Sequence, residues 1–197
     1  MRQNKRKLLS VLLTLAMLLG MLPALGVPAL ATSTTVTTKT ELMNAVKNSG
    51  EIILGADIVL TDEGFDYYPV KIGSGIEITL DLNGHVLDRS RIELGQNESR
   101  GGVIENNGTL VIKDSNPSTP HTLYKKSEAW RPNVYTVEDK SGTDGYTVAA
   151  TITGGAIIGG YNNYGAGINN NGTLILEGGT ICGNEAGTKG GGVWNQS

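Results

Sequence analysis

The chain has 197 residues, with 16 lysines and arginines against 19 aspartates and glutamates, and a formal net charge of −3. Several of the cations lie near the N-terminus, between Arg2 and Lys7, so the remaining sequence is more acidic and lacks the basic stripe that binding to a nucleic-acid backbone requires. A single cysteine excludes an intramolecular disulfide, and 28 glycines make the long helices of an α-helical solenoid unfavourable.

Residues 1–31 have the three parts of a secretory signal peptide. Basic residues from Arg2 to Lys7 precede an apolar run over Leu8–Leu22, and Ala29-Leu30-Ala31 provides a small-residue cleavage site. A membrane anchor is the alternative, but the apolar run is shorter than the roughly 20 residues that span a bilayer. The sequence therefore predicts an exported chain, secreted or on the cell surface, with no transmembrane segment after cleavage.

Residues 32–61 are expected to contain a Ser/Thr-rich linker, an N-terminal cap and a first strand. Thr38 and Glu41 have the spacing of a capping box, and apolar residues then recur at helical spacing as far as Val46. The pattern predicts a short helix that ends at Gly50. Such a helix would cover the apolar cross-section at the start of a repeat structure.

Short motifs recur along residues 62–197 at nearly constant spacing. Ile168-Asn169-Asn170 returns as Val193-Trp194-Asn195, an offset of 25, and residues 153–157 return as residues 177–181, an offset of 24. Residues 104–110 match residues 168–174 at an offset of 64, which is one repeat plus about 40 inserted residues. Three short strands separated by glycine-containing turns fit one repeat, so we expect the coils of a parallel β-helix with a loop insert at 116–149.

Alternation within the matched strands assigns their side chains to two faces. If Ile104, Ile168 and Val193 point inward, then the next residues, Glu105, Asn169 and Trp194, point outward. The inward positions that follow are asparagines: Asn106, Asn170 and Asn195. Identical amides one repeat apart can hydrogen-bond along the stack, so we interpret them as a structural ladder rather than a metal or sugar site. Gly108 and Gly172 follow as corner residues for which we expect positive φ.

The insert is the strongest candidate for ligand binding. It carries Tyr124, Trp130 and Tyr135 among lysines and an arginine, and Tyr161 and Tyr164 follow in the next repeat. Aromatic faces beside cations and amides suit sugar rings, and loops on a rigid scaffold commonly carry binding residues. The alternative is that these aromatic residues pack the insert against the flank of the coils.

Other reactive side chains give no recognisable constellation. Asp81 and Asp88 could form the acid/base pair of a glycosidase, but we expect both to face solvent. His85 and His121 lie in separate segments without the spacing of a zinc site, so we expect no metal and no cofactor. We expect Cys182 to point outward, stacked on the preceding repeat.

Two sets of motifs resemble a known family. Leu80–His85 (LDLNGH) follows Gly55–Ile58 (GADI), and Gly-Thr-Leu and Gly-Gly-Thr-Ile-x-Gly-Asn segments recur later. They resemble the right-handed parallel β-helix, or pectin-lyase-like, repeat proteins that Gram-positive bacteria secrete. The resemblance covers residues 40–115 and 150–197, and it implies the right-handed form of the β-helix. The scaffold carries lyases, hydrolases, adhesins and proteins of no known activity, and the motifs of polygalacturonase-like hydrolases and pectate lyases are missing here.

The sequence therefore predicts an all-β chain, a right-handed parallel β-helix with a short N-terminal capping helix. We expect a non-catalytic cell-surface or adhesin-like protein whose partner is a polysaccharide or a host or cell-surface glycan, and not a nucleic acid. A polysaccharide lyase or glycoside hydrolase and a structural stalk are the alternatives. Because Ser197 falls where another Gly-Thr-Leu turn is due, we also expect the natural chain to continue beyond it.

Overall fold

The computed structural model describes residues 33–60, 67–90, 101–126 and 134–196. The predicted signal peptide and Trp130 lie outside these ranges. Among the described residues, no helix is both long enough and apolar enough to cross a bilayer.

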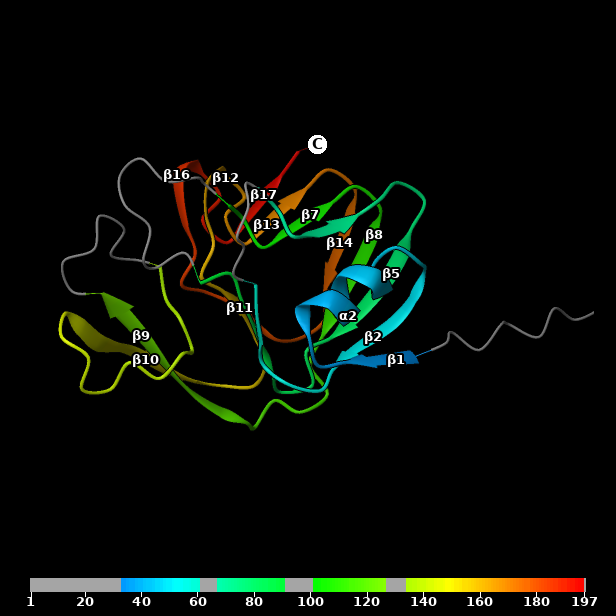
Figure 1. Ribbon diagram of the computed structural model, residues 1–197. Helices are drawn as coiled ribbons and strands as arrows, with labels where there is room; N and C mark the ends of the chain where they lie inside the picture. Colours follow the sequence, from blue (N-terminus) through cyan, green and yellow to red (C-terminus); the bar gives the residue numbers. More distant parts are fainter. Residues whose placement is uncertain (1–32, 61–66, 91–100, 127–133, 197) are drawn as a thin grey trace, which may run out of the picture. The chain divides into compact units, whose positions relative to one another are not determined.

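Three parallel sheets form the framework of the described chain (Figure 1). Sheet A has the order β1 (Ser33–Val36), β2 (Gly50–Leu54), β5 (Glu77–Asp81), β8 (Thr109–Lys113) and β14 (Thr173–Leu176). Sheet B has the order β3 (Ile58–Val59), β6 (Val86–Asp88), β11 (Ala156–Ile158) and β15 (Thr180–Ile181). Sheet C has the order β4 (Val70–Ile72), β7 (Ile104–Asn106), β13 (Ile168–Asn170) and β17 (Val193–Asn195). From β2 onward the chain passes through A, B and C in turn, and we call each passage a circuit. The prediction of an all-β chain is confirmed.

Equivalent residues of successive circuits pair directly. Ile168 lies between Ile104 and Val193 in sheet C, and Ala156 pairs with Thr180 in sheet B. The spacings along the chain in these pairs are the ones at which the sequence motifs recur. The insertion between β8 and β11 therefore leaves the register of the parallel sheets unchanged.

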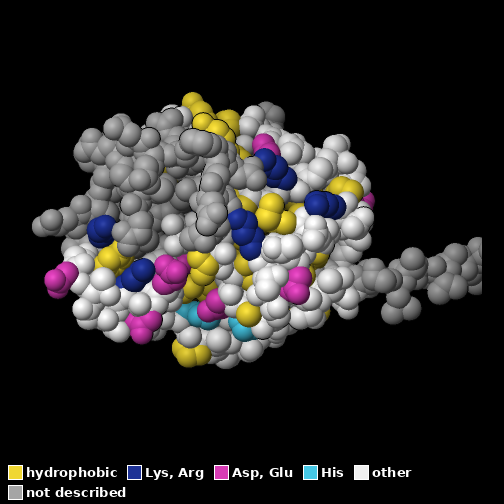
Figure 2. Space-filling view, viewed as in Figure 1, with side chains coloured by type: hydrophobic (Ala, Val, Ile, Leu, Met, Phe, Trp, Pro, Cys, Tyr) yellow, Lys and Arg dark blue, Asp and Glu magenta, His cyan; other side chains and the backbone are white. Residues whose placement is uncertain are grey.

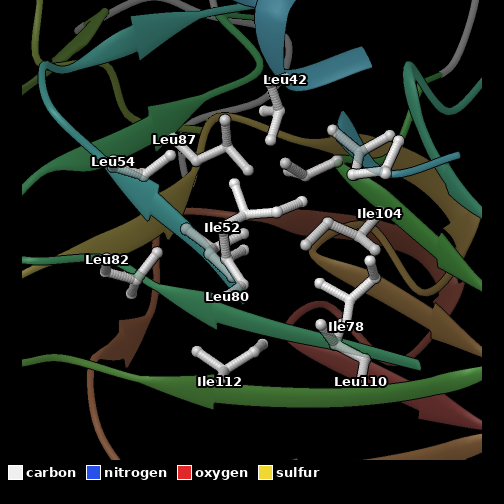
Figure 3. Close-up of a cluster of buried hydrophobic side chains, with 14 of the residues drawn as sticks. Leu42, Ile52, Leu54, Ile78, Leu80, Leu82, Leu87, Ile104, Leu110 and Ile112 are labelled. Carbon is white, nitrogen blue, oxygen red and sulfur yellow. The ribbon is translucent and has the colours of Figure 1, made fainter. Parts of the chain in front are cut away.

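The side chains that point inward from the three sheets form one hydrophobic core, which we call the inner cluster (Figure 3). In β5, buried Ile78 and Leu80 alternate with half-buried Thr79, as the period of two predicts. The residues labelled in Figure 3 are Leu42, Ile52, Leu54, Ile78, Leu80, Leu82, Leu87, Ile104, Leu110 and Ile112.

The predicted capping helix is present as α2 (Lys39–Ala45). The Thr38 Oγ1 atom accepts a hydrogen bond from the Glu41 amide at 3.3 Å, and Glu41 Oε2 accepts one from the Thr38 amide at 3.1 Å. Leu42 is fully buried in the inner cluster. The helix ends before the predicted Gly50, because that residue begins β2. The expected linker is in part strand β1, since the run Ser33–Val36 is rich in β-branched residues that pair with β2.

Two glycine corners correct the expectation of positive φ. Gly108 and Gly172 are not among the residues with positive φ. A Cβ atom on Gly108 would collide with the carbonyl oxygen of Ile76, and one on Gly172 with that of Gly108. Glycine is required at these corners because the backbones of successive circuits approach closely.

The insert folds as an antiparallel hairpin of β9 (Pro120–Lys126) and β10 (Tyr146–Thr153). Its second strand therefore extends past the predicted boundary at Ala149. Buried Leu123 of β9 packs against residues on the outward face of sheet B, and Tyr135, Val137 and Cys182 pack around them. The buried members of this outer cluster are Val86, Leu123, Ala156 and Ile158.

A further two-stranded parallel sheet lies between sheets B and C in the order of the chain. It pairs β12 (Tyr161–Tyr164) with β16 (Glu185–Lys189), with an irregularity between Asn162 and Tyr164. It belongs to the last two described circuits. Its strand β12 carries Tyr161 and Tyr164, which the sequence analysis predicts as ligand-binding residues.

Candidate functional site

The predicted asparagines form a hydrogen-bonded row at the end of sheet C. Asn106 Nδ2 donates to Asn170 Oδ1 at 2.6 Å, and Asn170 Nδ2 donates to Asn195 Oδ1 at 2.6 Å. Asn106 Oδ1 also accepts from the Gly108 amide at 3.1 Å, and Asn170 Nδ2 donates to the Gly172 carbonyl at 2.9 Å. The amides are thus engaged with one another and with the corner backbone, which favours a structural role over ligand binding.

Asn169, for which alternation predicts an outward direction, is nevertheless nearly buried. Only 9% of its surface is accessible, and its Oδ1 atom accepts a hydrogen bond from Gln196 Nε2 at 3.3 Å. It also hydrogen-bonds with Tyr68, a residue that the chain brings in from before β4. Outward direction in a strand therefore does not mean exposure here, because neighbouring segments cover this face.

An aromatic pair, which we call the aromatic platform, consists of Tyr164 and Trp194. The rings stack with centroids 4.5 Å apart and planes 28° from parallel. Tyr164 ends β12 and Trp194 lies in β17. Gly190 (φ 69°) brings the backbone close to Trp194, since a Cβ on this glycine would lie 2.7 Å from Trp194 Cβ. Tyr164 is 39% exposed, and hydrophobic side chains reach the surface over the region of β12 and β17 (Figure 2).

Tyr68 supports the backbone beneath the platform. Its hydroxyl donates to the Tyr164 carbonyl at 2.7 Å and accepts from Asn162 Nδ2 at 2.6 Å. Burial raises the pKa of Tyr68 to about 12, so the hydroxyl stays protonated and remains a donor. The backbone that carries Tyr164 is therefore held at a fixed position.

Polar and charged residues lie on the two-stranded sheet that carries Tyr164. Exposed Lys189 pairs with Tyr164 across β12 and β16, and Glu185 pairs with half-buried Tyr161. Asn163 adds an amide between the two tyrosines. The site thus combines aromatic faces with an ammonium, a carboxylate and an amide, and these groups can stack on a sugar ring and hydrogen-bond its hydroxyls.

The aromatic residues of the insert make contacts of their own. A hydrogen bond with Asp139 raises the pKa of Tyr124. The Tyr135 ring lies against Gly183, where a Cβ would approach it at 2.6 Å, and the Tyr135 amide donates to the Gly183 carbonyl at 3.1 Å. These contacts favour the packing alternative for the insert over ligand binding.

Asp81 and Asp88 do not face solvent, contrary to expectation. Asp88 is fully buried beneath the insert and accepts from Thr136 Oγ1 at 2.6 Å and from the Val137 amide at 3.0 Å. Burial raises the pKa of Asp88 to about 6. Asp81 is 3% exposed; burial alone would raise its pKa, but hydrogen bonds from Ser115 and Asn83 lower it. Each carboxylate is held by backbone amides, so the two do not form an acid/base pair.

His85 and His121 both lie close to the Asp57 carboxylate, although their spacing in the sequence did not predict that they share a partner. Asp57 Oδ1 is 3.3 Å from His85 Nδ1, and Asp57 Oδ2 is 3.8 Å from His121 Nδ1. Both histidines lie close together on the face shown in Figure 2. Within the described ranges, no group of three or more His, Cys, Asp or Glu side chains is placed to hold a metal ion.

Cys182 is half-buried in the outer cluster, which also contains Ile158 of the preceding circuit. Burial raises the pKa of the Cys182 thiol, which disfavours the nucleophilic thiolate.

Trp194 is the platform residue that was not predicted from the sequence to bind a ligand. Its signal was present, because the repeated motif of sheet C places it outward beside Asn169 and one circuit beyond the tyrosines of β12. Among the described residues, the other predicted binding residues, Tyr124, Tyr135 and Tyr161, do not stack on this pair, and Trp130 lies outside the described ranges.

No protein-family model matches this chain, and comparisons with curated proteins and with solved structures find none that is similar. A functional assignment therefore depends on the geometry of the chain itself.

Proposed function

We propose that this chain is an exported cell-surface or adhesin-like protein, built as a right-handed parallel β-helix of the pectin-lyase-like kind, which binds glycans without catalysis. The observation that carries the proposal is the aromatic platform of Tyr164 and Trp194. The passage of the chain through three parallel sheets and the in-register stacking of equivalent residues support the β-helix.

The platform has the features that a carbohydrate site needs. Its two rings come from strands of successive circuits and already stack on each other without a ligand. A preformed site loses little conformational entropy on binding. Lys189 and Asn163 lie on the same two-stranded sheet as Tyr164 and supply an ammonium and an amide that can hydrogen-bond sugar hydroxyls.

We propose that the chain does not catalyse a reaction because Asp81 and Asp88, the candidate acid/base pair, already accept structural hydrogen bonds. Asp81 accepts from the Asn83 and Ser115 amides at 2.9 and 3.0 Å, and Asp88 is covered by the insert. Neither lies in an open cleft where a glycosidic bond could sit between them.

Glycan-array binding with purified chain tests the proposal. We expect binding that Trp194→Leu lowers at least tenfold, because the substitution removes the larger ring of the platform. Val148→Ala is the matched control, since Val148 is an exposed apolar residue of β10 and should leave binding unchanged.

Intrinsic fluorescence gives a second readout. The chain has two tryptophans, so a Trp130→Phe background makes Trp194 the sole indole, and a bound sugar should shift its emission. If Trp194→Leu still binds glycans on the array, the binding site does not include the platform. If the wild type binds no glycan, the alternative of a structural stalk is favoured.

A further inference from the structure

Residues from three separate segments meet at the turn between β5 and β6. Asp57 precedes β3, Gly84 and His85 form the turn, and His121 is the second residue of β9. His121 contacts this corner from the insert, as Asn116 and Thr119 also do at Gly84, and its side chain is 9% exposed.

The backbone fixes which nitrogen of His121 carries hydrogen. The Nε2 atom lies 2.8 Å from the Gly84 carbonyl oxygen, which can only accept a hydrogen bond. Nε2 is therefore the donor, and in the neutral ring the lone pair is on Nδ1. That lone pair faces Asp57 Oδ2 at 3.8 Å.

The Asp57 carboxylate is held in place by the circuits themselves. Its Oδ1 atom accepts from the Val86 amide at 2.8 Å and lies 3.3 Å from His85 Nδ1. Among the described residues, Asp114 also lies at the corner, where it accepts from the Gly84 and Gly155 amides at 2.7 Å each. The Asp57 carboxylate therefore cannot turn away from His121 without giving up its contact with β6.

We propose that the insert is fastened to the circuits by a proton-dependent anchor, in which protonated His121 bridges the Gly84 carbonyl and the Asp57 carboxylate. In the imidazolium both ring nitrogens carry hydrogen, and both face an oxygen acceptor. In the neutral ring, Nδ1 and Asp57 oppose each other with lone pairs and the ion pair is lost. This anchor does not depend on the glycan-binding proposal.

The anchor is formed while His121 is protonated, because only the imidazolium carries hydrogen on both ring nitrogens, and it is lost when the ring becomes neutral. The start of β9 should loosen, whereas the outer cluster continues to hold Leu123.

Amide hydrogen exchange at residues 121–122, corrected for the intrinsic pH dependence of exchange, tests the anchor. We expect protection to fall about two- to fivefold between pH 5.5 and 8 in the wild type, as for a partly exposed ion pair. Asp57→Asn keeps an acceptor for the Val86 amide but removes the charge, and it should abolish this pH dependence. The matched control is His85→Asn, which should retain it.

Nitrogen NMR of the His121 ring in the wild-type chain gives a readout that needs no variant. We expect Nε2–H alone at high pH and both N–H groups at low pH. A neutral ring that carries hydrogen on Nδ1 would overturn the proposal, as would equal pH dependence in the wild type and Asp57→Asn. Loss of the pH dependence in His85→Asn would make His85 the sensor and would also overturn it.

Discussion

The inner and outer clusters are both buried, but they are built by different rules. The inner cluster lies between three sheets, and each inward residue meets its equivalent one circuit away, as Ile168 meets Ile104. The outer cluster joins the outward face of sheet B to residues of the insert such as Leu123, which has no equivalent in other circuits.

Stacking of equivalent residues stabilises the inner cluster, whereas contacts made once in the chain stabilise the outer cluster. A repeated core is supported from both neighbouring circuits, so its loss should disturb the whole unit. The outer cluster is supplemented by individual polar contacts, from Thr136 to Asp88 and from His121 to Gly84. We expect the insert to detach locally while the circuits remain folded.

The largest expected effect compares the same truncation in the two clusters. Leu110→Ala should lower the free energy of unfolding by about 3 kcal/mol, because it leaves a cavity in the inner cluster. Leu123→Ala deletes the same atoms from an equally buried position. It should change the urea midpoint of the β-sheet circular dichroism signal much less and mainly speed exchange in the hairpin. Equal midpoint shifts would show that the clusters unfold together.

The second effect compares two pairs of asparagines in neighbouring positions. Asn170→Leu should destabilise the chain by about 2 kcal/mol, because Asn106 and the Gly172 carbonyl lose buried partners. Asn171→Leu breaks the exposed bond to Asn107 and should cost a few tenths of that amount. Urea denaturation measures both, and a larger loss for Asn171→Leu would contradict the ladder as a source of stability.

The third effect concerns pH and the outer cluster. The pKa of Asp88 is raised from 3.8 to about 6 by burial, so the folded chain keeps a proton that the unfolded chain releases. This contribution, on the order of 2 kcal/mol, is complete below pH 3.8 and is lost as pH rises to about 6. Asp88→Asn should remove this part of the pH dependence, which the difference between the two urea profiles from pH 4 to 7 will measure.

The smallest effect concerns the N-terminal end of the inner cluster. Thr38→Ala removes the side-chain acceptor of the capping box and should destabilise the chain by about 1 kcal/mol. Thr40→Ala, within the same helix, is the control and should change the thermal midpoint little. Equal midpoints for the two variants would mean that the cap contributes nothing to covering the core.

The repeated parts of the fold could be predicted because stacking identical residues leaves a signature in one sequence. The recurrence of one short motif alone placed Asn170 on Asn195, and the structure pairs them. Capping is equally local, so Thr38 and Glu41 together indicated the start of α2.

The remainder depends on the path of non-repeating segments. Asp88 points outward as alternation requires, yet it is buried because the chain returns at Thr136 to cover it. His121 and Asp57 are distant along the chain, and no periodicity links them. Only half of the platform was predicted from the sequence. Tyr164 was predicted as a binding residue because it is aromatic, whereas Trp194 was predicted only to point outward.

The ends of the insert lie side by side, and this has a consequence for how the chain can vary. Thr153 pairs with Pro120, and the Gly154 amide donates to the Thr119 carbonyl at 2.8 Å. A segment grafted between these positions would enter and leave at one point, without stretching sheets A or B. The entropic cost of closing a loop rises only slowly with loop length. Segments of different length and sequence could therefore replace the insert at this corner while the parallel sheets stay unchanged.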